Sequence, residues 1–127
     1  MKRVVLAIRN RLVLEAVTNA LKRTGFFVEK SSSQETERII TLTNALAATT
    51  LVMDVTRSGD GTFDMRMNTA REVRRRNPEI KIALLCDNVS DESSAYKVKC
   101  AKEDGSVDAF FYESVPSDYL ADAIDVL

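Results

Sequence analysis

Several short apolar runs of the sequence end in groups that could act as nucleophiles or metal ligands. Asp54 comes directly after the run 51–53. Other polar groups in equivalent positions are Cys86, Asp87 and Glu113. A carboxylate at the end of a buried strand is desolvated, which favours its use as a ligand or a nucleophile. A capping or loop-bracing role would account for Asp54 equally well. Both interpretations of Asp54 stay open at this point.

The residue types that the chain lacks exclude several kinds of catalytic and metal site. The chain has no histidine and two cysteines, Cys86 and Cys100, which form no C-x-x-C motif. Histidine general bases, zinc sites of the Cys/His type and a phosphohistidine on this chain are therefore excluded. Cys86 could be a redox sensor, but the sequence supplies no base beside it to activate it. A small core residue is the better interpretation of Cys86.

Charge and cysteine usage limit the partners and the compartment. Eighteen Lys and Arg against 19 Asp and Glu give a net charge of −1, so no global positive field would hold a nucleic acid. The first apolar run, 4–8, ends at Arg9 and is too short for a secretory signal or a membrane span. Two distant thiols indicate a reducing compartment. We expect a cytoplasmic chain that binds neither nucleic acid nor membrane.

Apolar runs alternate with segments of helical spacing along the whole chain. Strands are predicted at 4–8, 26–28, 51–53, 80–85 and 109–112, and a helix follows each of them. Continuous apolar strands are typical of a parallel sheet that is covered by helices on both faces. The pattern predicts one α/β domain over residues 1–127.

Glycines and a serine mark the expected helix ends. Gly25 and Gly105 stand where the first and fourth helices should stop. Ser32-x-x-Glu35 has the pattern of a capping box and predicts the start of the second helix. The third helix is expected at about 63–76, with its apolar stripe on Met67, Ala70 and Val73.

Over its whole length the chain resembles a response-regulator receiver domain of two-component systems, with the chemotaxis-regulator-like fold. The residues that carry the resemblance are the segments 2–6, 51–54, 81–85 and 109–112, in their order and spacing. The resemblance implies a three-layer (βα)5, flavodoxin-like fold. With the right-handed crossover rule, it predicts a five-stranded parallel sheet in the order 2-1-3-4-5. Asp54 matches the phosphoacceptor of this family.

The other positions of the family's phosphorylation site depart from its pattern. Ile8 and Arg9 stand where the family has an acidic pair that holds Mg²⁺. Cys86 replaces a threonine or serine, and Glu113 replaces a lysine, whereas Phe111 matches the family's aromatic residue. The resemblance therefore implies a site lined by these residues and Asp87 around Asp54.

These departures remove the metal ligands and the lysine that phosphorylation of Asp54 would need. Transfer of a phosphoryl group needs a metal to offset its charge, and Mg²⁺ is usually held by more than one carboxylate. We therefore expect a degenerate receiver that is not an enzyme, uses no cofactor and binds Mg²⁺ weakly or not at all. We also expect the Arg9 guanidinium to pair with Asp54 in place of the missing cation.

The resemblance implies a protein partner, either a sensor kinase or an output protein or domain. In the family, the face formed by the fourth helix, fifth strand and fifth helix docks a partner or a second copy, which allows a homodimer here. Residues expected on this face are Tyr96, Lys97, Lys102, Tyr119 and Asp122.

Two other functions stay open. One is a phosphorylatable receiver with Asp54 as phosphoacceptor. The other is a flavodoxin-like binder of a small ligand, although the segment 9–11 after the first strand lacks the Gly, Ser or Thr of a phosphate-binding loop.

Overall fold

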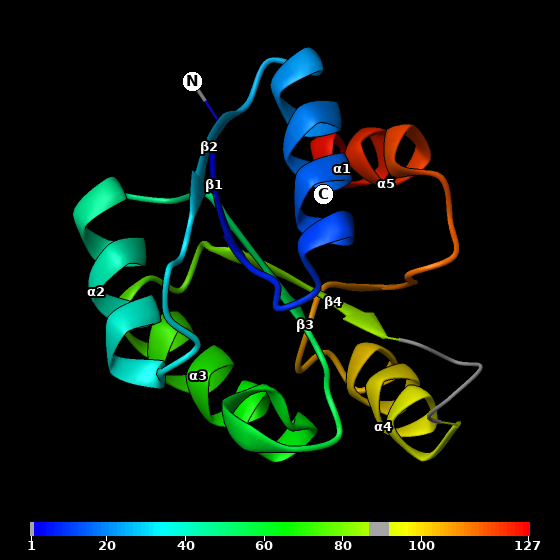
Figure 1. Cartoon of the computed structure of the whole chain (residues 1–127). Coiled ribbons are helices and arrows are strands. Elements are labelled where there is room, and N and C mark those ends of the chain that lie inside the picture. Colours follow the sequence, from blue (N-terminus) through cyan, green and yellow to red (C-terminus); the bar gives the residue numbers. More distant parts are fainter. Residues whose placement is uncertain (1, 87–91) are drawn as a thin grey trace.

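Strands and helices alternate throughout the described part of the chain, which comprises residues 2–86 and 92–127 of a computed structural model (Figure 1). The strands are β1 (Arg3–Ala7), β2 (Phe27–Lys30), β3 (Thr50–Asp54), β4 (Lys81–Cys86) and β5 (Ala109–Tyr112). The helices are α1 (Arg11–Arg23), α2 (Thr36–Leu46), the short 3-10 helix η1 (Gly59–Gly61), α3 (Phe63–Arg76), α4 (Glu92–Glu103) and α5 (Ser117–Asp125). Asp87 and the predicted start of the fourth helix at Ser90 and Asp91 lie outside the described residues.

The five strands form one parallel sheet in the order β2-β1-β3-β4-β5, which confirms the predicted topology. β1 lies beside β3, with Ala7 opposite Met53. β3 lies beside β4, with Asp54 opposite Leu85. The carboxyl ends of β1, β3 and β4 therefore meet at one edge of the sheet, where the polar residues identified in the sequence follow the strands.

Alternate residues of the strands supply two separate core layers. One layer packs under α1 and α5 and contains Val4, Leu6 and Val52. The opposite layer packs under α2, α3 and α4 and contains Val5 and Met53. This arrangement is visible in Figure 1, where α1 and α5 lie together on one side of the sheet. Burial on both faces explains why the strands are continuous apolar runs.

The predicted helix ends are partly confirmed. Gly25 (φ +99°) and Gly105 (φ +84°) adopt the left-handed conformation just after α1 and α4. The capping box is wrong, because α2 begins after Glu35 and no side chain caps it. The Ser33 hydroxyl accepts a hydrogen bond from the backbone amide of Glu35 at 3.1 Å. This serine therefore stabilises the loop before the helix and does not cap the helix.

No helix among the described residues is both long enough and apolar enough to cross a membrane.

Candidate functional site

Asp54 is buried at the carboxyl end of β3, and both oxygens of its carboxylate are hydrogen-bonded. Only 1% of the residue is exposed to solvent. Oδ1 accepts from the Arg66 guanidinium at 2.9 Å, and Oδ2 accepts from the backbone amide of Arg9 at 2.9 Å. A buried carboxylate needs such partners, because burial of an unpaired charge is costly. Asp54 is thus held from two sides at the edge of the sheet.

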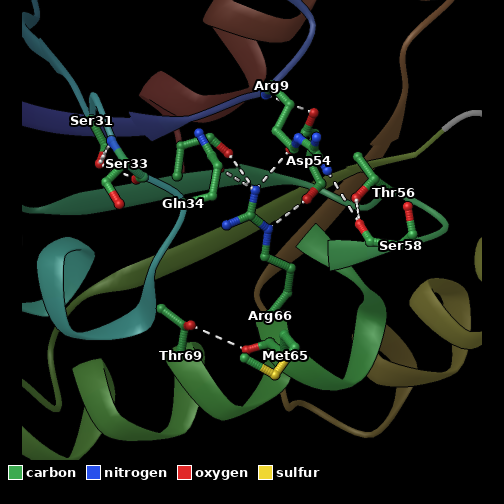
Figure 2. Close-up of polar contacts among 11 residues, drawn as sticks. Arg9, Ser31, Ser33, Gln34, Asp54, Thr56, Ser58, Met65, Arg66 and Thr69 are labelled. Carbon is green, nitrogen blue, oxygen red and sulfur yellow. Dashed lines mark hydrogen bonds and ion pairs between the residues drawn. The ribbon is translucent and has the colours of Figure 1, made fainter. Parts of the chain in front are cut away.

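Arg66 of α3 supplies the counter-charge from inside the protein (Figure 2). Its Nε donates to the backbone oxygen of Asp54 at 2.8 Å. Its Nη2 donates to the backbone oxygen of Ala7 at 3.0 Å and to Oε1 of Gln34 at 2.5 Å, in addition to Asp54. The residue is 0% exposed. One guanidinium therefore connects the ends of β1 and β3 with the loop between β2 and α2.

The expected ion pair between the guanidinium of Arg9 and Asp54 is wrong. Arg9 is exposed, and its Nη1 donates to the backbone oxygen of Ser58 at 3.2 Å. The contact of Arg9 with Asp54 is made by its main chain. The physical reason is that Arg66 approaches the carboxylate from the core side, so the charge of Asp54 is already paired without the Arg9 side chain.

Arg66 is the functional residue that the sequence analysis missed. The expected apolar stripe of the third helix is confirmed at Met67, Ala70 and Val73, all of which are buried. Arg66 precedes Ala70 by four residues and Val73 by seven, which places it on the same helical face. A charged residue on an apolar stripe, following a strand that ends in a buried aspartate, is the signal that could have found it.

Burial lowers the pKa of Arg66, because desolvation disfavours the charged guanidinium. The charge of Asp54 and its hydrogen bond to Arg66 oppose this effect. Arginine has such a high intrinsic pKa that the group keeps its proton in proteins. The Arg66 guanidinium therefore stays positively charged beside Asp54 across the physiological pH range.

The remaining predicted site residues are spread over both faces of the sheet. Ile8 is buried in the layer under α1 and α5, and Phe111 is partly buried against the same layer. Cys86 is buried in the opposite layer. Glu113 is half-buried and lines a cavity of about 220 Å³ with Leu12 and other residues of α1 and α5. Asp87 lies outside the described residues.

The described residues around Asp54 do not offer the ligand set of a divalent metal. Magnesium sites usually combine one or two carboxylates with water and phosphate in an octahedral shell. The described residues contain no group of three or more His, Cys, Asp and Glu side chains that could hold a metal ion. At the carboxylate itself, the guanidinium of Arg66 contacts Oδ1 and repels a cation from that side.

No protein-family model matches the sequence, and no curated protein matches it either. The similarity lies in the three-dimensional structure. The receiver domain of a CheY-like response regulator from Methanospirillum hungatei JF-1 matches with a TM-score of 0.74 and 15% sequence identity, over 99% of this chain and 92% of that one. The fold is that of a receiver domain.

Two further solved structures share this receiver fold. The response regulator TrrA from Thermotoga maritima, in complex with Mg²⁺-BeF, matches with a TM-score of 0.74 and 17% identity, over 99% of this chain and 98% of that one. A protein from a novel family of redox sensors in the streptococci, evolved from two-component response regulators, matches with a TM-score of 0.77 and 16% identity. That match covers 99% of this chain and 50% of the streptococcal one.

Proposed function

We propose that the chain is a receiver module of two-component signal transduction that acts through protein–protein contact and not through Mg²⁺-dependent phosphorylation. The observation that carries the proposal is the state of Asp54, which is 1% exposed and has both carboxylate oxygens hydrogen-bonded. A nucleophile must reach the phosphorus atom of its donor in line with the leaving group. The burial of Asp54 and the hydrogen bonds to both its oxygens therefore favour a function without phosphorylation.

Electrostatics support the same proposal. Phosphorylation of a carboxylate brings two or more negative charges to the site, which a metal and a basic side chain would have to balance. The cation beside Asp54 is a guanidinium in the core, and Ile8 supplies no metal ligand. In this proposal the module is not an enzyme. It signals by binding a partner protein through its surface.

The solved relatives are consistent with more than one use of the fold. TrrA was solved with Mg²⁺-BeF, and the streptococcal protein belongs to redox sensors that evolved from response regulators. The receiver fold thus occurs in proteins described by different functions, and we propose for this chain a function that does not use phosphorylation. Its two cysteines, Cys86 and Cys100, suit a reducing cytoplasmic compartment.

We assign the partner surface to the face formed by α4, β5 and α5. Two large side chains are exposed there, Tyr96 on α4 and Tyr119 on α5, at 69% and 62%. Exposed tyrosines are enriched at protein interfaces because they combine an apolar ring with a hydrogen-bonding hydroxyl. The partner is a protein, either a sensor kinase or output protein or a second copy of this chain.

A small acyl-phosphate donor with Mg²⁺ tests the proposal directly. Intact-protein mass spectrometry of the wild-type chain should show no phosphoryl adduct after incubation, and the Asp54→Asn variant should give the same spectrum. An adduct on the wild-type chain that disappears in Asp54→Asn would show a phosphorylatable receiver and overturn the proposal.

A further inference from the structure

Three oxygen atoms converge on one nitrogen of the buried arginine. Nη2 of Arg66 lies 3.0 Å from the backbone oxygen of Ala7. It also lies 2.5 Å from Oε1 of Gln34 and 2.9 Å from Oδ1 of Asp54 (Figure 2). We call these three atoms the oxygen cage. They come from β1, from the loop before α2 and from β3, so the fold and not one local motif brings them together.

The oxygen cage has the chemistry of a cation site. It combines one carboxylate oxygen, one amide oxygen and one backbone carbonyl oxygen, which are the donor types that hard cations take in proteins. All three atoms lie within hydrogen-bond distance of Nη2 and share its two N–H groups, so they are oriented toward a positive charge. The positive charge that they receive is covalently attached to α3.

We propose that the oxygen cage is a cation site which the chain fills permanently with the guanidinium of Arg66. This inference rests on the proposed function and deepens it, because it names what replaces the divalent metal at Asp54. A bound metal ion exchanges with solvent, whereas a guanidinium on a buried side chain does not. The domain therefore keeps one arrangement around Asp54 whatever the metal concentration.

The hydrogen bonding of Arg66 indicates that this residue does more than fill space in the core. Its Nη1 is buried and has no acceptor among the described residues. A buried donor without a partner is destabilising, and apolar side chains of similar volume often replace a buried ion pair at no loss of stability. The guanidinium is thus explained by the charge that it brings to the oxygen cage.

Chemical rescue of the Arg66→Ala variant tests this inference. The substitution removes the guanidinium and leaves the oxygen cage in place. Added methylguanidinium chloride should raise the melting temperature of Arg66→Ala in a saturable way, by about 3 °C or more at several times its dissociation constant. The wild-type chain and Arg71→Ala, which loses an exposed arginine of the same helix, should show no such increase.

The neutral molecule N-methylurea separates cation binding from simple filling of a cavity. It has nearly the same shape as methylguanidinium but carries no charge, so it should not stabilise Arg66→Ala. An equal increase with both molecules, or no increase with either, overturns the cation site. If Arg66→Ala unfolds without an added cation, the same titrations are followed as the folded fraction by circular dichroism, with the same expected difference.

The outcome for the cation site is separable from that for the proposed function. Absence of rescue, together with a wild-type chain that takes no phosphoryl group, overturns the cation site alone. Phosphorylation of the wild-type chain overturns the proposed function whatever the rescue experiment gives. A further variant, Arg66→Ala with Asp54→Asn, should lose the rescue because the oxygen cage no longer carries a negative charge.

Discussion

Asp54 and Arg66 each make the burial of the other tolerable. Each is at most 1% exposed, and each would be a costly buried charge if it stood alone. Their ion pair at 2.9 Å is supported by the Arg9 amide on one oxygen of the carboxylate and by Gln34 and Ala7 on the guanidinium. Loss of one partner should therefore be far more damaging than loss of both.

Replacement of Arg66 alone should reveal the cost of an unpaired Asp54. We expect Arg66→Ala to lower the free energy of unfolding by about 3–5 kcal/mol, as for other broken buried pairs. Arg71→Ala is the matched control, because Arg71 is exposed on the same helix, and it should change stability by no more than about 0.5 kcal/mol. Urea unfolding measures both values, and equal losses in the two variants would contradict the role of Arg66.

Replacement of both partners should recover most of that loss. In Asp54→Leu with Arg66→Met, no charge remains to be desolvated, so stability should stay within about 1–2 kcal/mol of the wild-type chain. The four proteins of the cycle, unfolded in urea, give the coupling energy between the two residues. Strictly additive losses would mean that the two side chains do not depend on each other.

The loop between β3 and α3 keeps Ser58 within reach of Arg9 through a tight internal contact. The amide of Thr56 donates to the backbone oxygen of Gly61 at 2.7 Å. A Cβ atom on Gly61 would lie 2.4 Å from Oγ1 of Thr56, closer than such atoms approach in proteins. Glycine at this position allows the loop to fold back over the end of β3.

This contact predicts a pair of compensating substitutions. Gly61→Ala should destabilise the domain by about 1–3 kcal/mol, because the added methyl group displaces Thr56 or the loop backbone. Thr56→Ala in the same chain removes the clashing oxygen and should reduce the loss. Thermal unfolding of the two single variants and the double variant measures the effect, and a double variant as damaged as Gly61→Ala would show that the strain lies elsewhere.

The strands and the third helix were predictable because their signals are local, whereas the site partner was not. The buried run 51–53 places Asp54 at a strand end. The helical spacing of the apolar residues in α3 predicts which of its faces is buried. The choice between Arg9 and Arg66 as the partner of Asp54 depends on how α3 packs under the sheet. That packing is a tertiary property. The spacing of residues along α3 does not by itself show whether Arg9 or Arg66 reaches Asp54.

At the scale of the whole molecule, the alternation of strands and helices predicts a parallel sheet, and the resemblance to receiver domains selects its strand order. Right-handed crossovers leave few ways to connect parallel strands, and the order β2-β1-β3-β4-β5 is one of them. The sequence predicts the exposed surface less well than it predicts the sheet. Charge and exposed side chains on α4 and α5 depend on which helix faces are left uncovered, and the sequence pattern alone does not fix this.

The face of α4, β5 and α5 has charges of both signs that suit a twofold contact between two copies. Lys97 and Lys102 are exposed on α4, and Asp122 is exposed on α5. In a twofold dimer, α4 of one copy can lie against α5 of the other, so that each lysine-bearing helix meets an acidic one. Tyr96 and Tyr119 would add apolar area at the centre of this contact.

Self-association should therefore depend on these tyrosines. Sedimentation velocity over a concentration series should show a monomer–dimer equilibrium for the wild-type chain. Tyr96→Asp with Tyr119→Asp should weaken dimerisation at least tenfold, a change of about 1.4 kcal/mol, because it replaces apolar contacts with repelling charges. Phe27→Asp is the matched control, since Phe27 is 45% exposed on β2, at the opposite edge of the sheet from β5, and it should leave the equilibrium unchanged. A wild-type chain that stays monomeric at every concentration would exclude a second copy as the occupant and leave a different protein as the partner of this face.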